Sequence, residues 1–425
     1  MTWMTRKSPP NFPTLNYKVL QMKRSLSFIG LMFFTCGFAL GLNPILLPVL
    51  RQSLQVSSLQ SYLIVFASFV PFLIWGWPAQ ASIRRWGYKA TMALAFVGFA
   101  LSFGIYLWAA SALSFPLFLL ASFVSGSANA VLQASINPYV TFLGPIESGA
   151  QRISLMGICN KLAWPLPSLF MVWFVGHEVA SLRLSELTSP FMIIIGIMLV
   201  LAGACLLFPL PAISLDGNAS DPADAGTDVP QSAEPARLAD FPHLWLGALT
   251  LFLYVGVETV SLATGVDYAD SLGLERADLY AWIAPVGMII GYIAGVILIP
   301  RYLSQGAALR ICSAIAILGS VLVPLLPAAS SIWALGLLAL GCSLMWPAIW
   351  PLASCDLGSY TAKGNALLTM SIAGGAVIPT VFGALCDASM DACGTIQLAY
   401  WICLPCFLFI FIYGVWGHKI RRHRK

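Results

Sequence analysis

Single amides and one tryptophan interrupt long apolar stretches of this chain. They are Asn43, Gln133, Asn137, Asn160 and Trp346. An amide side chain both donates and accepts hydrogen bonds, as a sugar hydroxyl does, and an indole ring offers a flat apolar surface on which a pyranose can stack. Because Gln133 and Asn137 have the i, i+4 spacing, they would share one face of a helix. The set predicts a binding cavity for a small uncharged polyol.

A structural role competes with this interpretation. Polar side chains also hydrogen-bond between packed membrane helices, for less than about 1 kcal/mol each. For any one amide taken alone, the two roles are equally open. The Gln133 and Asn137 pair lies beside Pro138, where a helix kinks, and this favours the cavity.

The stretches that hold these residues are long enough to cross a membrane. Hydrophobic residues make up 59% of the 425 residues and charged ones only 9%, whereas a soluble domain has about 25% charged residues. A helix crosses the hydrocarbon core in roughly 20 apolar residues. The sequence therefore predicts an all-α membrane protein with twelve transmembrane helices. We place them near residues 26–50, 59–80, 88–110, 114–138, 149–175, 189–208, 243–267, 279–299, 305–326, 331–353, 363–385 and 395–416.

A polar segment divides the chain into two parts. Residues 209–242 are rich in Asp, Ala, Pro and Ser, a composition that cannot bury enough apolar area to fold. We expect this linker to join six-helix halves at 26–208 and 243–416, with an N-terminal arm at 1–25 and a basic tail at 417–425. Two such halves, related by an axis along the membrane normal, enclose a substrate cavity in many transporters.

Lysine and arginine positions predict the orientation. If the N-terminus is cytoplasmic, the inner segments carry 18 of the 22 lysines and arginines, and the outer segments carry only Arg51, Arg183 and Arg276. Both termini would then be cytoplasmic. The net charge of +5 follows from this topology and indicates no nucleic-acid partner. The basic tail is expected to contact anionic lipid headgroups.

The residues between the fourth and fifth spans resemble a known family. Residues 137–152 read NPYVTFLGPIESGAQR, with a turn expected at Gly144–Pro145. This elbow resembles that of bacterial hexose permeases of the fucose–proton symporter group, within the major facilitator superfamily, and the resemblance covers most of the chain. It implies two six-helix halves of that type and transport of a monosaccharide across the inner membrane by alternating access. It also implies cavity-lining roles for Asn43, Gln133, Asn137, Asn160, Glu258 and Trp346.

The chain departs from that family where coupling would occur. Pro44 stands where the fucose–proton members have a carboxylate, and Gln133 stands where they have a glutamate. The glucose/galactose branch typically has glutamine there, so Gln133 favours a glucose- or galactose-like sugar over a fucose-like one. Lys161 replaces a small polar residue, and Tyr292 replaces an arginine. The resemblance is to a divergent member.

The loss of both acids leaves the coupling mechanism open. A proton symporter needs a group that takes up and releases a proton as the cavity alternates its exposure. Glu258 is the main candidate. Because a buried charge is costly unless it is paired, we hypothesise that Lys161 pairs with Glu258 across the cavity. Proton coupling, sodium coupling and uncoupled facilitated diffusion are the alternatives.

Other functions are disfavoured to different degrees. The main alternative is a permease or effluxer of the same fold for another small neutral solute. An enzyme is not expected, since the four histidines lie near span ends or in tails. No metal-ligand spacing or P-loop occurs in the sequence, so we expect neither a metal site nor a cofactor. We expect a monomer, with Asp267 and Asp270 in water at the outer mouth.

Overall fold

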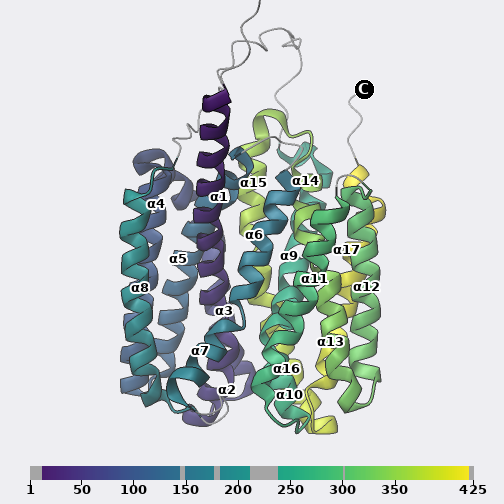
Figure 1. Cartoon of the computed structure of the whole chain (residues 1–425). Coiled ribbons are helices and arrows are strands. Elements are labelled where there is room, and N and C mark those ends of the chain that lie inside the picture. Colours follow the sequence, from purple (N-terminus) through teal and green to yellow (C-terminus); the bar gives the residue numbers. More distant parts are fainter. Residues whose placement is uncertain (1–11, 144–148, 177–181, 211–237, 300–301, 421–425) are drawn as a thin grey trace, which may run out of the picture.

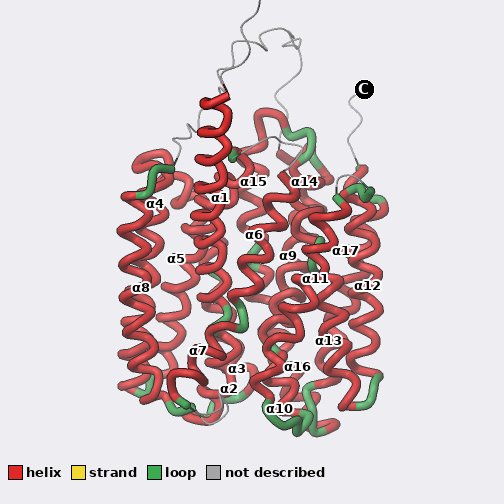
Figure 2. Tube along the Cα trace, in the orientation of Figure 1, coloured by secondary structure: helices red, strands yellow, loops and turns green. Residues whose placement is uncertain are grey.

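The computed structural model describes residues 12–143, 149–176, 182–210, 238–299 and 302–420. This part of the chain is a bundle of helices with short connections and contains no strand (Figures 1 and 2). The turn predicted at Gly144–Pro145 and most of the predicted linker lie outside the described residues.

The number of membrane spans agrees with the prediction once one long segment is divided. The described residues contain eleven helical segments that are long and apolar enough to cross a membrane. One of them, Ser58–Ala112, has 55 residues, about 80 Å at 1.5 Å per residue, which is more than twice the thickness of the hydrocarbon core. Gly87 interrupts it with a φ of 79°, a left-handed conformation that glycine adopts without strain. Division at Gly87 gives twelve spans, and the predicted fold class is confirmed.

Several spans of the N-terminal half consist of two consecutive helices. Pro44 lies in the first turn of α2, Pro71 begins α4 and Pro167 lies in the first turn of α7. Proline lacks an N–H, so it is tolerated in a first turn but interrupts a continuing helix. The helices of this half are α1 (Phe12–Leu40), α2 (Asn43–Leu54), α3 (Ser58–Phe69), α4 (Pro71–Ala112), α5 (Phe115–Phe142), α6 (Gly149–Ala163), α7 (Leu166–Val175) and α8 (Thr188–Leu207).

The C-terminal half repeats this organisation. Its first, fourth and fifth spans are each divided into two helices, at Thr264, at residues 343–344 and at residues 372–373. The α-helices of this half are α9 (Pro242–Ala263), α10 (Gly265–Ser271), α11 (Ile283–Leu298), α12 (Gln305–Leu325), α13 (Ala328–Cys342), α14 (Met345–Ser354), α15 (Thr361–Ser371), α16 (Gly374–Cys393) and α17 (Cys403–Val415).

The first helix begins earlier than the span predicted at residues 26–50, within the segment 1–25 that was expected to be an N-terminal arm. Helix α1 begins at Phe12 and projects beyond the neighbouring helices in Figure 1. Pro13 suits the first turn of a helix, and no glycine or further proline follows until Gly30. The polar composition of residues 12–25 was therefore a poor guide to the helix start.

Buried apolar residues form two clusters that correspond to the two halves. One consists only of residues from Phe28 to Leu210. The other is drawn mainly from the C-terminal half and also includes Tyr62, Phe69 and Trp164 of the N-terminal half, at the seam. Across this seam α6 packs against α11, α3 against α16, α4 against α15 and α2 against α10.

Within the N-terminal half, α1 and α6 are in backbone contact. A Cβ added at Gly37 would lie 2.0 Å from the carbonyl oxygen of Asn160, and one at Gly41 would lie 2.1 Å from that of Trp164. Neither distance is possible for a real side chain. Only glycine permits this approach, and small residues at helix interfaces are the usual means of tight packing in membranes.

The described chain begins and ends on the same face of the bundle. In Figure 1, α1 begins and α17 ends at the upper face, which we call the termini face. Helices α2, α7 and α10 lie at the lower face, which we call the opposite face.

Candidate functional site

A cavity lies between the two halves, at the middle of the spans. Its volume is about 90 Å³, and both halves contribute to its wall. Small-molecule sites usually measure about 300–1,000 Å³, so the halves hold this cavity in a contracted form. Six of the seven residues predicted from the sequence line it: Gln133, Asn137, Asn160, Lys161, Glu258 and Trp346.

An ion pair crosses this cavity from one half to the other. Lys161 on α6 places its Nζ 3.1 Å from Oε1 of Glu258 on α9. Both residues are less than one-tenth exposed. The hydroxyl of Tyr254 donates to the same Oε1 at 2.6 Å. The structure thus contains the pair hypothesised from the sequence, and the two charges compensate each other where an isolated charge would be strongly unfavourable.

The amide side chains are held in place but keep hydrogen-bonding capacity. Nε2 of Gln133 donates to Oδ1 of Asn129 at 2.9 Å, and Nδ2 of Asn160 donates to the carbonyl oxygen of Phe33 at 3.1 Å. Within the described part of the chain, Asn137 has no side-chain partner. Each amide offers several donor and acceptor positions, so all three retain groups that a bound hydroxyl could engage.

Aromatic rings that sequence reasoning did not select complete the wall. Tyr254, Tyr292 and Trp164 all line the cavity, and Nζ of Lys161 lies 5.6 Å from the centre of the Trp164 ring. The Trp346 ring is 6.5 Å from that of Tyr254. Spacing offered a signal for two of them. Trp164 follows Lys161 at i+3 and Tyr254 precedes Glu258 at i−4, which are same-face positions of a helix.

The structure does not place Asn43, the remaining predicted residue, in the wall of this cavity. Asn43 is the first residue of α2 and is 2% exposed. Its Oδ1 accepts a hydrogen bond of 3.3 Å from the hydroxyl of Ser68 on α3, in the same half. The regular helix α1 ends at Leu40, before Asn43. Because of this break, helical spacing counted from Leu40 does not predict the direction of the Asn43 side chain. In this structure the helix-contact alternative describes Asn43.

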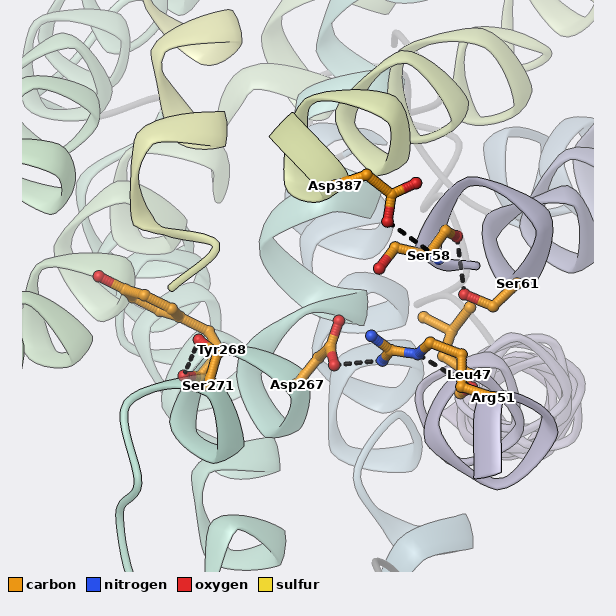
Figure 3. A network of polar contacts seen from close by, with 8 residues as sticks. All are labelled: Leu47, Arg51, Ser58, Ser61, Asp267, Tyr268, Ser271 and Asp387. Carbon is orange, nitrogen blue, oxygen red and sulfur yellow. Dashed lines mark hydrogen bonds and ion pairs between the residues drawn. The ribbon is translucent and has the colours of Figure 1, made fainter. Parts of the chain in front are cut away.

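A second set of inter-half polar contacts closes the opposite face. Arg51 on α2 forms an ion pair with Asp267 on α10, and Nε of Arg51 donates to the carbonyl oxygen of Leu47 at 3.4 Å (Figure 3). Asp267 is 6% exposed and was wrongly expected to lie in water, whereas Asp270 is exposed. Arg51 was not selected because its partner belongs to the other half of the sequence.

Asp387 on α16 reinforces this closure. Its carboxylate oxygens accept hydrogen bonds from the backbone N–H groups of Ser58 (Figure 3) and of Leu59, each at 3.2 Å. The first N–H groups of a helix have no partner within the helix, so a residue of one half caps a helix of the other. Next to it, the ring of Tyr62 packs edge-on against Phe382, with centroids 5.8 Å apart.

The chemistry available in the cavity is hydrogen bonding, ring stacking and one internal ion pair. Among the described residues, no group of three His, Cys, Asp or Glu side chains could hold a metal ion. A neutral guest with several hydroxyls matches the amides and rings, since the two charges of the wall already compensate each other.

Comparisons with known proteins agree with this arrangement. The family model described as Major Facilitator Superfamily matches residues 28–380. The chain is 30% identical over 408 residues to the glucose/galactose transporter of Brucella abortus biovar 1 (strain 9-941), covering 93% of this chain and 94% of that protein. It is 30% identical over 410 residues to the L-fucose-proton symporter of Escherichia coli (strain K12), covering 90% of each.

A solved structure is similar over nearly the whole length. The crystal structure of the transporter FucP in the outward conformation superposes with a TM-score of 0.69 at 26% sequence identity, covering 93% of this chain and 99% of that chain. The family resemblance inferred from the elbow sequence is confirmed.

Proposed function

The chain belongs to the Major Facilitator Superfamily, and from that premise we propose that it carries a monosaccharide across the membrane by alternating access. It is a transporter and not an enzyme. The observation that carries the sugar assignment is the composition of the cavity wall: amides and aromatic rings surround an ion pair that cancels its own charge. Such a wall suits an uncharged polyhydroxy molecule.

The preferred sugar is glucose- or galactose-like. Gln133 lies in the cavity wall at the position where the resemblance places glutamine in the glucose/galactose branch and glutamate in the fucose branch. The Brucella relative is named a glucose/galactose transporter. A neutral amide at this position removes one of the family's acids from the wall and leaves a hydrogen-bonding group of the same length.

Coupling, in this proposal, depends on Glu258 and Lys161. One relative is named a proton symporter, yet the two acids of the fucose–proton members are Pro44 and Gln133 here. The remaining carboxylate in the cavity wall is Glu258. Protonation of Glu258 would break its pair with Lys161 and alter the connection between the halves. A proton would thereby be linked to their relative position.

The orientation follows from the positive charges. The termini face would be cytoplasmic, because it carries most of the lysines and arginines, and the opposite face would be outside the inner membrane. The contacts of Arg51, Asp267 and Asp387 then close the outer side in this conformation. Alternation requires these contacts to break when the outer side opens.

The deciding experiment is uptake by the purified protein in proteoliposomes. Labelled glucose, galactose and fucose are supplied with an imposed proton gradient, a sodium gradient or none. We expect glucose or galactose to accumulate with the proton gradient, and Glu258→Gln to retain exchange of sugar without gradient-driven accumulation. Full accumulation in E258Q would remove Glu258 from the coupling mechanism. Transport of none of the three sugars would favour another small neutral solute.

The cavity amides provide the matched test of substrate binding. Asn137→Ala removes a cavity amide that has no partner in the described part of the chain, and we expect about fivefold weaker apparent sugar affinity, the effect of one lost hydrogen bond of about 1 kcal/mol. Asn43→Ala is the control, because Asn43 lies outside the cavity. An equal loss in both variants would contradict the assignment of Asn137 to the site.

A further inference from the structure

A second pocket lies on the termini face, away from the central cavity. Its volume is about 440 Å³. Ser304, Gln305, Gly306 and Arg310 line it from the start of α12, and His418 and Lys419 line it from the short turn after α17. The transport cycle described above uses none of these residues.

The pocket is basic, and its cations have no ion-pair partner among the described residues. Arg310, His418 and Lys419 contribute to the wall, and no lining residue is acidic. Arg310 and Lys419 are exposed, and neither forms an ion pair with any described residue. Two unpaired cations around one hollow favour an anionic ligand.

The start of α12 adds backbone hydrogen-bond donors suited to the same ligand. The N–H groups of Gln305 and Gly306 have no acceptor within the helix, whereas that of Ala307 donates to the hydroxyl of Ser304, and this helix end carries partial positive charge. Nδ1 of His418 lies 3.0 Å from the carbonyl oxygen of Tyr413. Because a carbonyl only accepts, Nδ1 carries the proton there, and the neutral ring has no second N–H to offer a ligand. Nε2 faces Gly306, 3.4 Å from where a Cβ would lie.

The position of the pocket indicates where the ligand comes from. Tyr302 and Trp416 lie two residues before the lining residues Ser304 and His418 in the sequence, and they are 71% and 66% exposed. Exposed tyrosine and tryptophan rings at helix ends are typical of the headgroup level of a bilayer. The stem of Arg310 lies against α17, with its Cγ 3.4 Å from a Cβ added at Gly414. The pocket therefore opens between helix ends at the depth of lipid phosphates.

We propose that this pocket binds the phosphate group of an anionic phospholipid in the leaflet next to the termini face. Arg310 and Lys419 supply the charge, and the N–H groups of Gln305 and Gly306 at the start of α12 supply directed hydrogen bonds. Basic pockets between helix ends on the cytoplasmic side are known lipid headgroup sites. A bound lipid would join α12 to the turn after α17, two elements of the same half.

The test uses the full chain in nanodiscs of phosphatidylcholine with or without phosphatidylglycerol, with bound lipids counted by native mass spectrometry. We expect one phosphatidylglycerol to stay bound to the unaltered protein after exchange. In Arg310→Gln/Lys419→Gln its affinity should fall roughly thirtyfold, about fivefold for each cation. Arg84→Gln/Arg85→Gln removes the same charge from exposed positions elsewhere and should keep the lipid.

Two further arms make the result decisive. Arg310→Lys/Lys419→Arg keeps both charges and should retain the lipid, which separates lost binding from lost folding. Inorganic phosphate, added to the protein in phosphatidylcholine, should neither displace phosphatidylglycerol nor protect the protein against heating. Equal lipid loss in the two glutamine variants, or equal protection by phosphate alone, would overturn the proposal.

Discussion

Among the described residues, two ion pairs join the halves, and their surroundings differ. Lys161 and Glu258 meet in the wall of the central cavity, where Tyr254 adds a hydrogen bond to the same carboxylate oxygen. Arg51 and Asp267 meet at the opposite face, where Oδ2 of Asp267 is buried without a partner among the described residues.

This difference separates two tasks. The cavity pair lies where a sugar would bind, so a guest or a proton can act on it directly. The opposite-face pair has no contact with the cavity, and Arg51 keeps 22% of its side chain exposed to the surroundings. It holds two helix ends together and is less deeply buried, so breaking it should cost less free energy than breaking the cavity pair.

The largest effect is expected from breaking the cavity pair on one side. Lys161→Met leaves Glu258 buried without its cation, and we expect a loss of about 3 kcal/mol in the free energy of unfolding. The double variant Lys161→Met/Glu258→Gln should recover most of this stability, because no charge is then left unpaired. Denaturation of the purified variants in detergent measures both. A double variant as unstable as K161M would show that packing, and not charge, dominates at this site.

A smaller effect is expected at the opposite face. Arg51→Gln removes a partly exposed partner of Asp267, and we expect the population to shift by about 1–2 kcal/mol toward the state open on that face. Distances between spin labels on the opposite-face ends of α3 and α16 would report the shift. Arg276→Gln serves as the control, since Arg276 pairs with Asp278 within one half. If both variants change the distances equally, Arg51 does not hold that face closed.

The smallest effect concerns the cap that Asp387 provides. Asp387→Ala removes the acceptors of two backbone N–H groups of α3, and caps of this kind contribute about 1 kcal/mol. We expect the same direction of shift as in R51Q, with a smaller amplitude in the same distance measurement. Asp391→Ala, at an exposed position one turn further along α16, should leave the distances unchanged. A larger shift in D387A than in R51Q would reverse the assigned order of the two contacts.

The fold was predictable because its signals are local. Apolar runs of membrane length and the polar linker are each read over short windows, and they gave the twelve spans and two halves. We did not predict the start of α1, because residues 12–25 are too polar to resemble a membrane span. The helix nevertheless includes these polar residues and runs from them into the span.

The site was predictable only where polar residues stood out from an apolar background. Glu258, Lys161 and the cavity amides did so, whereas Tyr254 and Trp164 are ordinary residues of an apolar helix until their neighbours are known. The structure does not place Asn43 in the cavity wall, because a helix break changes the direction of the side chain. Arg51 and Asp267 are 216 positions apart, and nothing in either local sequence identifies the other as its partner.

The glycine contacts between α1 and α6 have a consequence for both ion pairs. With backbone against backbone at Gly37 and Gly41, the span that carries Arg51 cannot slide along the helix that carries Lys161. Their partners Asp267 and Glu258 also share one span, formed by α9 and α10. The two ion pairs thus connect the same two parts of the bundle at different depths: the closely packed spans that carry Arg51 and Lys161, and the span that carries Asp267 and Glu258. A tilt of one part relative to the other therefore strains both ion pairs, and their free energies are thermodynamically linked.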